Sequence, residues 1–291
     1  MAILAVFAFV ERSIDRPMLD VGLFRNLRFT ATSGSITIAF FTLAGFTFLI
    51  TQYFQFVKGY GPLGTGVRLL PVASSIAVAS VLGTRLAVRI GNKAVVAAGL
   101  ASFGAVLFWI AVNTASTSYL VIVMQMLVGG GGLGLITAPA TEAIMGAVPA
   151  EKAGVGSAVN DATRLFGAAL GVAVIGSVAA SLYASRLGVL VPPSIPVAAA
   201  SAAKGSLGGA LVAAQQLAQG GHAALAHDLV AAAVSAFLRG FMGSLRVAGL
   251  VALGGSVMAA LLLPSRPVAS GRVPAPRASD ASLPPGLAGE M

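Results

Sequence analysis

The feature that most constrains this chain is an apolar stretch at residues 29–57, FTATSGSITIAFFTLAGFTFLITQYFQFV, which contains no charged side chain. A helix that crosses the hydrocarbon core of a bilayer needs about 20 mostly apolar residues, at a rise of about 1.5 Å per residue. The stretch is therefore long enough to span a membrane as one helix. A barrel strand would be shorter and would alternate in polarity, and the stretch does neither.

The same pattern recurs along most of the chain. Five further apolar stretches cover residues 65–88, 94–113, 119–147, 153–183 and 243–264. Hydrophobic residues make up 57% of the sequence and charged residues only 9%, whereas a soluble domain carries about 25% charged residues. We therefore predict an all-α integral membrane protein with a six-helix transmembrane bundle, in which Pro71 and Pro139 interrupt or kink their helices.

The segments between these stretches suggest an organisation for the whole chain. The apolar start, MAILAVFAFV, covers only about half a bilayer at 1.5 Å per residue, so it resembles either the tail of a spanning helix or a short interfacial segment. We expect residues 1–10 to be the remnant of a transmembrane helix, 11–28 a cytoplasmic loop, 29–184 transmembrane helices one to five, 185–242 a long extracytoplasmic segment with amphipathic helices, 243–265 helix six, and 266–291 a disordered cytoplasmic tail.

Basic side chains set the expected orientation. The net charge is +9, and basic residues gather in the cytoplasmic loops of membrane proteins. The loop that contains Arg85, Arg89 and Lys93 is therefore placed in the cytoplasm, and KGYGPLGTG and NTASTS are placed outside. No basic patch is interleaved with aromatic residues, so we expect membrane lipid rather than nucleic acid as a partner. We expect the protein to lie in the plasma membrane of the cell.

Several chemistries have no residues to support them. The chain has no cysteine, which excludes disulfides and thiolate metal sites. His222 and His227 are five residues apart rather than at the i, i+4 spacing that directs two ligands to one metal, and we interpret them as surface residues. The glycines at 129–132 lack the strand and the lysine of a phosphate loop. We expect no enzymatic activity and no cofactor.

Three segments of the chain resemble a known family. FRNLRFT, FLITQYFQFVKGYGPLGTGVRLLP and GGLGLITAPATEAIMGAVPAEKAGVGSAVNDATRLFGAALGVAVIGSV are similar to the C-terminal half of major facilitator superfamily transporters, and more narrowly of fourteen-helix drug:proton antiporters of the EmrB/QacA type. In LAVRIGNK, Arg89, Gly91 and Lys93 match the superfamily's cytoplasmic loop motif, whereas Val88 stands where the stronger copy has Asp.

The resemblance implies proton-coupled efflux of small amphipathic, drug-like compounds by alternating access. In such transporters the substrate site lies between two six-helix halves, and this sequence resembles one half. The chain could pair with a separate N-terminal half, associate with itself, or be a truncated fragment or partner subunit that does not transport. The sequence leaves these alternatives open.

Charged residues in the fifth stretch are candidates for proton coupling. Asp161 and Arg164 would lie about 12 and 16 Å into the helix, where an ionisable residue costs about 2.5–3.5 kcal/mol and usually has a partner. Glu142 on the preceding helix is expected at a similar depth. One interpretation is an Asp161–Arg164 ion pair that locks packing. The other is a proton or cation site in which Arg164 holds one acid and the second exchanges protons.

The substrate wall has its own candidates. One face of the first span carries Phe41, Phe48, Gln52 and Gln55, which suits bulky amphipathic compounds. The alternative is that the phenylalanines face lipid and the glutamines lie at the membrane interface. Asn160 is a further cavity candidate. Gly167 and Gly171 form a GxxxG pair that we interpret as a close helix contact.

Overall fold

The computed structural model describes residues 27–146 and 153–263. The expected helix remnant at 1–10, most of the cytoplasmic loop at 11–28 and the tail at 266–291 lie outside these residues. All regular structure in the described part is helical: α2 (Leu27–Gln52), the π-helix η2 (Tyr53–Val57), α3 (Pro62–Arg68), α4 (Leu70–Ile90), α5 (Asn92–Ile110), α6 (Tyr119–Gly146), α7 (Ala153–Leu190), α8 (Val197–Gly205), α9 (Leu207–Gln219) and α10 (Ala223–Leu262).

Six helical segments are long and apolar enough to cross a membrane, which confirms the predicted all-α class and the six spans. They are Phe29–Val57, Pro62–Ile90, Asn92–Ile110, Tyr119–Gly146, Ala153–Leu190 and Ala223–Leu262. The second span is broken at Leu69, between α3 and α4, as the position of Pro71 predicts. Pro139, by contrast, lies inside an unbroken α6.

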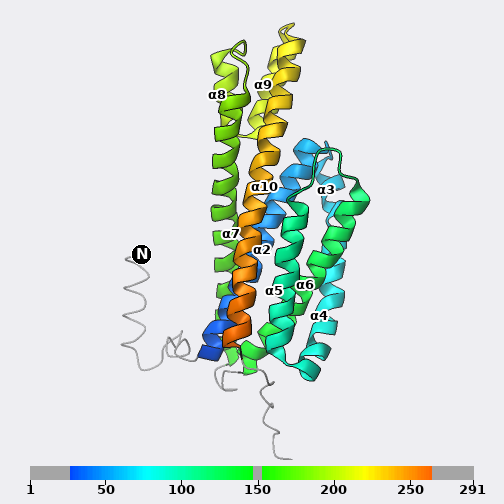
Figure 1. The fold of residues 1–291 in the computed structure, drawn as a ribbon, viewed down its shortest axis with the longest axis vertical. Helices are drawn as coiled ribbons and strands as arrows, with labels where there is room; N and C mark the ends of the chain where they lie inside the picture. Colours follow the sequence, from blue (N-terminus) through cyan, green and yellow to red (C-terminus); the bar gives the residue numbers. More distant parts are fainter. Residues whose placement is uncertain (1–26, 147–152, 264–291) are drawn as a thin grey trace, which may run out of the picture.

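The loop motif forms the tight turn between α4 and α5, at the lower end of the bundle in Figure 1. Gly91 joins the two helices with a φ of 90°, a conformation that a residue with a Cβ rarely adopts. Its N–H donates to the carbonyl of Ala87 at 2.9 Å. Arg89 is exposed and Lys93 half-buried beside it, so the motif's glycine makes the turn and its cations flank it.

Glycines on α6 allow α4 and α5 to pack closely on either side. A Cβ at Gly130 would lie 2.6 Å from the carbonyl oxygen of Val72 on α4, and one at Gly132 would lie 2.8 Å from the carbonyl oxygen of Gly99 on α5. Small residues of this kind let helix backbones approach each other inside a membrane. The glycine-rich run of α6 is therefore a packing surface.

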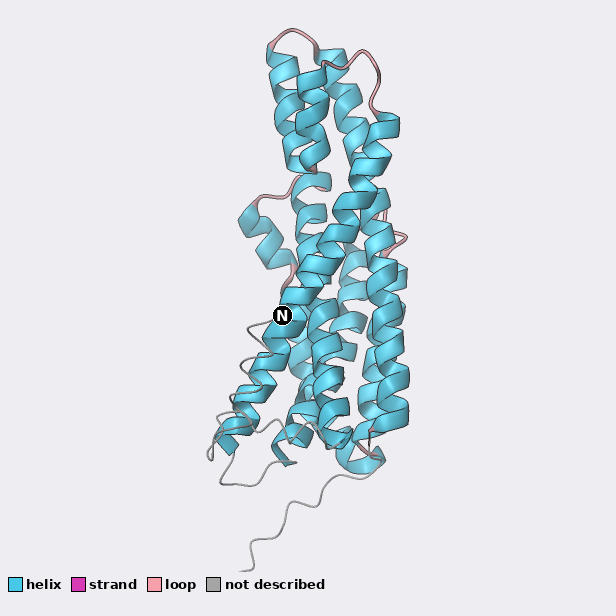
Figure 2. Ribbon diagram, turned by 90° about the vertical axis from the view of Figure 1, so that its left-hand side faces the viewer, coloured by secondary structure: helices cyan, strands magenta, loops and turns pink. Residues whose placement is uncertain are grey.

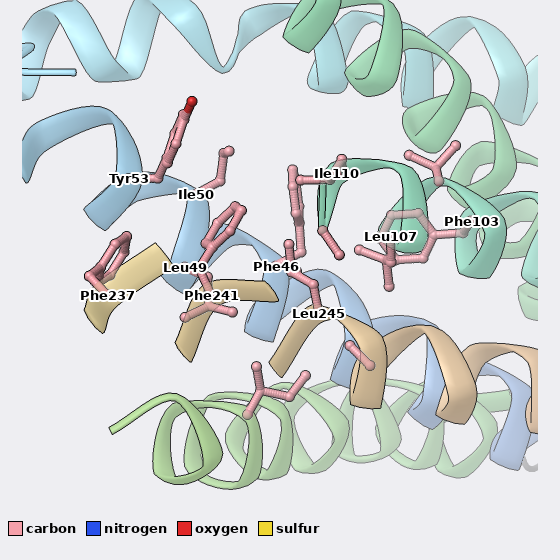
Figure 3. Close-up of a cluster of buried hydrophobic side chains, with 14 of the residues drawn as sticks. Phe46, Leu49, Ile50, Tyr53, Phe103, Leu107, Ile110, Phe237, Phe241 and Leu245 are labelled. Atoms are coloured by element: carbon pink, nitrogen blue, oxygen red, sulfur yellow. The ribbon is translucent and has the colours of Figure 1, made fainter. Parts of the chain in front are cut away.

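A cluster of buried aromatic and aliphatic side chains joins α2, α5 and α10 (Figure 3). Phe46 and Phe103 meet edge to face with ring centroids 6.4 Å apart, and Tyr53 stacks on Phe241 at 5.2 Å. Offset and edge-to-face geometries of this kind are the favoured arrangements of aromatic pairs. This cluster holds α2 in the centre of the molecule, with one of its sides left for α7.

The fifth and sixth spans are much longer than the bilayer. α7 has 38 residues and α10 has 40, so each is roughly 60 Å long at 1.5 Å per residue, about twice the thickness of the hydrocarbon core. Their upper ends project beyond the other helices and pack with α8 and α9 (Figures 1 and 2). We call this part, residues 180–235, the extension.

The extension differs in its boundaries from the expected segment at 185–242. The sixth span was expected to begin at residue 243, but α10 begins at Ala223. The intervening residues are strong helix formers such as alanine and leucine, and the buried side chains of Leu229, Ala233 and Ala236 give them a packed face. One continuous helix therefore replaces a separate amphipathic helix and span.

Candidate functional site

α7 lies against α2 through two glycines. A Cβ at Gly167 would overlap the carbonyl of Thr37, and a Cβ at Gly171 would overlap the carbonyl of Phe41. Any larger residue would force the helices apart, which confirms that the GxxxG pair is a packing contact. The contact also determines which residues of the two helices border each other on the open side.

An open groove of about 630 Å³ follows this helix pair. Its lining consists of Phe40, Leu43, Ala44, Thr47, Phe48, Thr51 and Gln52 from α2, and Ala168 and Val172 from α7. All these side chains are uncharged. Apolar atoms form nearly all of this surface, so it can hold an apolar body, and the two hydroxyl groups and one carboxamide are its few polar groups, as in small-molecule sites generally.

The groove includes only part of the predicted substrate wall. Phe48, which is 39% exposed, and Gln52 both line it. Phe41 does not, because its backbone lies against Gly171, and Gln55 lies one turn beyond, within η2.

Sequence reasoning missed Phe40, Thr47 and Thr51, which line the groove from neighbouring positions of α2. Their spacing of seven and four residues places them on one helical stripe. Two threonines in register with an aromatic ring on that stripe were the available signal.

A smaller cavity of about 180 Å³ adjoins the upper end of the groove. It is lined by Phe48, Leu49, Gln52, Gly176, Ala179, Ala180, Tyr183, Gly205, Ser206, Leu207 and Phe237. Phe48 and Gln52 therefore border both spaces. Gly205, Ser206 and Leu207 belong to the junction of α8 and α9, so the extension covers this end of the α2–α7 face.

Arg164 borders the groove at the other end. Its guanidinium carbon lies 5.1 Å from the centroid of the Phe40 ring, and its Nη2 donates to the hydroxyl of Thr141 on α6 at 2.8 Å. Its Nε is buried without a hydrogen-bond partner. The guanidinium is thus held between α2, α6 and α7 by an aromatic ring and a neutral hydroxyl group.

No carboxylate lies within 4.0 Å of Arg164 in the part of the chain that the structure describes, where the salt bridge formed is His227–Asp228 at 3.9 Å. The interpretation of Asp161 and Arg164 as an ion pair is therefore wrong. Asp161 and Glu142 are both exposed. Thr141 takes the place at the guanidinium that an acid was expected to fill.

Asp161 shares the groove's side of α7. It precedes Ala168 by seven residues and Val172 by eleven, so the three residues form one helical stripe. The carboxylate therefore lies beyond the lower end of the groove, roughly 10 Å along the helix from Ala168.

Asn160 is 5% exposed, and its Oδ1 has no hydrogen-bond partner. It is not among the residues that line the groove. His222 and His227, on the extension, are exposed as predicted.

Six apolar helices long enough to span a membrane, two of which border an open groove, define the class of this molecule as a multi-pass helical membrane protein. The sequence model of the Major Facilitator Superfamily matches residues 5–172, which is more than half of the chain. The chain belongs to that superfamily, which comprises transporters rather than enzymes.

Curated relatives carry names that refer to drug resistance. The chain is 35% identical over 192 residues to the multidrug resistance protein Stp of Mycobacterium tuberculosis, covering 66% of this chain and 36% of Stp. It is 29% identical over 254 residues to the multidrug efflux pump LfrA of Mycolicibacterium smegmatis, covering 87% of this chain and 49% of LfrA. A methylenomycin A resistance protein of Streptomyces coelicolor is 32% identical over 174 residues, 60% of this chain and 37% of the relative. The matched regions thus span about a third to a half of these relatives.

Proposed function

We propose that this chain is one half of a proton-coupled transporter that exports small amphipathic compounds across the plasma membrane by alternating access. The observation that carries the proposal is the α2–α7 groove, an apolar surface with hydroxyl and carboxamide groups that lies on the same side of α7 as Asp161. Two relatives of this chain carry names that refer to multidrug resistance and multidrug efflux.

Proton exchange is assigned to the exposed carboxylates. Arg164 is bound to Thr141 and Phe40, so it leaves Asp161 and Glu142 accessible to take up and release protons. A carboxylate attracts a cationic group or a proton but does not accommodate both well at once. Such competition between proton and substrate is the requirement for exchange, because each ligand must favour a different state of the protein.

A second set of helices is required to complete the site. Substrate sites in this superfamily form between two repeats near the middle of the membrane, and the groove supplies a single wall. The matched regions span 36% of Stp and 49% of LfrA. We therefore propose that a separate N-terminal half, or a second copy of this chain, covers the groove during transport.

The test is dye efflux from cells that express the chain alone or together with the N-terminal half of a relative as a separate polypeptide. We expect efflux that stops when the proton gradient is dissipated. The double variant Asp161→Asn, Glu142→Gln is expected to be made in normal amounts and to lose this efflux, whereas Asp228→Asn on the extension retains it. Efflux unaffected by the double variant would refute the assignment of the proton site. Absence of efflux in every combination would favour a non-transporting membrane component.

A further inference from the structure

At the upper end of the bundle, Lys58 and Arg68 form no ion pair with an acidic side chain of the described residues. Between Leu27 and Thr141 the sequence contains no aspartate or glutamate. Lys58 and Arg68 nevertheless lie at the end of the bundle formed by η2, α3 and the α5–α6 loop, which the loop charges predict to be extracytoplasmic. Short loops on that side of a membrane usually avoid basic residues. An anion from outside the chain is therefore the available partner for an unpaired cation here.

Lys58 is already engaged by the protein. Its ammonium group donates to the carbonyl oxygens of Ala115 at 2.7 Å and Thr117 at 2.5 Å, and it lies 5.8 Å from the centroid of the Tyr53 ring. Partial burial lowers the pKa of Lys58. These bonds fasten the α5–α6 loop to the end of the first span, which gives Lys58 a structural role.

Arg68 is held in place but its donors are mostly unused. The guanidinium carbon lies 3.8 Å from the centroid of the Tyr60 ring and 5.6 Å from that of Tyr119. Nη1 donates to the carbonyl of Gly64 at 3.1 Å, and Nε is buried without a partner. A guanidinium has five N–H donors, so the two rings orient a planar cation that still has donors to offer.

The surface around Arg68 has the composition of a membrane interface. Leu63 on α3 is 83% exposed, and Val67 and Leu70 beside it are exposed as well. Tyrosines such as Tyr60 and Tyr119 are typical of the level of the lipid headgroups. Arginine at this level keeps its charge at the headgroups while its stem covers apolar surface.

We propose that Arg68 binds the phosphate of an anionic phospholipid, whose acyl chains lie over Leu63, Val67 and Leu70. The guanidinium matches a phosphate group because two parallel N–H donors can bind two of its oxygens. With no acid on the first three spans, nothing in that part of the sequence repels an anionic headgroup. The tyrosine rings keep the guanidinium oriented before the lipid arrives, which reduces the entropy lost on binding.

The test measures phosphatidylglycerol binding to the purified full-length chain by native mass spectrometry. Arg68→Gln is expected to bind this lipid about fivefold more weakly, since a basic residue at a membrane surface contributes about 1 kcal/mol. Arg68→Lys keeps the charge but loses the planar fork. Its affinity for the lipid is expected to lie between that of Arg68→Gln and that of the unmodified chain. Arg239→Gln, which removes an exposed arginine from α10, is the matched control and should bind as the unmodified chain does.

The outcomes separate a lipid from a free anion. Phosphatidylglycerol is expected to raise the melting temperature of the unmodified chain more than phosphatidylcholine does, and inorganic phosphate alone is expected to have no effect. Equal lipid binding by Arg68→Gln and the unmodified chain would overturn the proposal, as would equal stabilisation by inorganic phosphate. Should Arg68→Gln fail to fold, Arg68→Lys is decisive, and unchanged lipid binding by that variant would also overturn the proposal.

Discussion

Two helix pairs in this molecule use the same packing device and present different surfaces. α6 packs on α4, and α7 packs on α2, through glycines whose missing side chains admit a neighbouring backbone. On the outward side of α4, the exposed residues in the middle of the helix include Val78, Val81 and Leu82. The groove on the open side of the α2–α7 pair is lined in part by Thr47, Thr51 and Gln52, and the exposed Asp161 lies below its lower end.

The difference shows how to tell a lipid-facing surface from a site when both are exposed. A purely aliphatic surface is matched to hydrocarbon and needs no further partner. A surface with hydroxyl, carboxamide and carboxylate groups is costly in hydrocarbon, so it implies a cavity or another set of helices. Glycine packing holds both pairs together, and the α2–α7 pair borders a surface that carries a carboxamide and a carboxylate.

The largest expected effect is on the α4–α6 contact. A Cβ at Gly134 would lie 2.6 Å from the carbonyl oxygen of Ile76, so Gly134→Val should destabilise the protein by about 3 kcal/mol, which is the upper end of the usual cost of overpacking. The free energy of unfolding in mixed micelles would measure it. Gly131→Val is the control, because the nearest atom to a Cβ there, Oγ of Ser75, is 3.7 Å away. Equal losses in the two variants would contradict the packing role.

Arg164→Met should separate stability from transport on the α2–α7 side. The guanidinium has a single hydrogen bond, to Thr141, and no counter-ion in the described residues. Replacing such a charge with an apolar side chain should leave the free energy of unfolding within about 1 kcal/mol or raise it. Efflux by the paired halves should nevertheless be lost, because the variant removes the cation that borders the lower end of the groove beside Phe40. A variant that unfolds yet transports at lower temperature would show that Arg164 only supports the fold.

Phe48→Ala should weaken substrate binding without disturbing the fold. Phe48 is exposed and borders both the groove and the smaller cavity, so losing its ring should raise the apparent KM for a bulky apolar dye about tenfold, since burying a phenylalanine is worth about 1.5–3 kcal/mol. Val78→Ala on the aliphatic surface of α4 should leave KM unchanged. The same shift in both variants would mean that the two surfaces do not differ in function.

The smallest effect is expected at Lys58, which links the end of α2 and η2 to the α5–α6 loop. Lys58→Gln should lower the free energy of unfolding by about 1 kcal/mol, because hydrogen bonds from the ammonium group are lost. Burial lowers the pKa of this lysine below its ordinary 10.5, so the folded chain loses that proton at a lower pH than the unfolded chain does. The lysine's contribution to stability should therefore rise with pH between its lowered pKa and 10.5. Unfolding curves of both proteins across that range would show whether the slope disappears in the variant.

The agreement between sequence and structure follows the range of the interactions involved. The six spans and the break before Pro71 were predictable because they depend on runs of neighbouring residues. The end of the fifth span and the start of α10 were less predictable. Alanine-rich segments beyond the bilayer become helical only where they can pack on one another. Likewise, the spacing of Asp161 and Arg164 suggested an ion pair, but the guanidinium instead reaches Thr141 on another helix.

The sequence by itself determined a helical membrane protein with six spans. Whether an apolar run can cross the bilayer depends on its own length and polarity, which are local properties of the sequence. The tertiary structure decided that Phe40 rather than Phe41 lines the groove. Adjacent helical residues point about 100° apart, and the contacts of Gly167 and Gly171 set which of those directions faces α7. It also decided that the guanidinium of Arg164 binds a hydroxyl group of α6, beside a ring of α2, while Asp161 stays exposed.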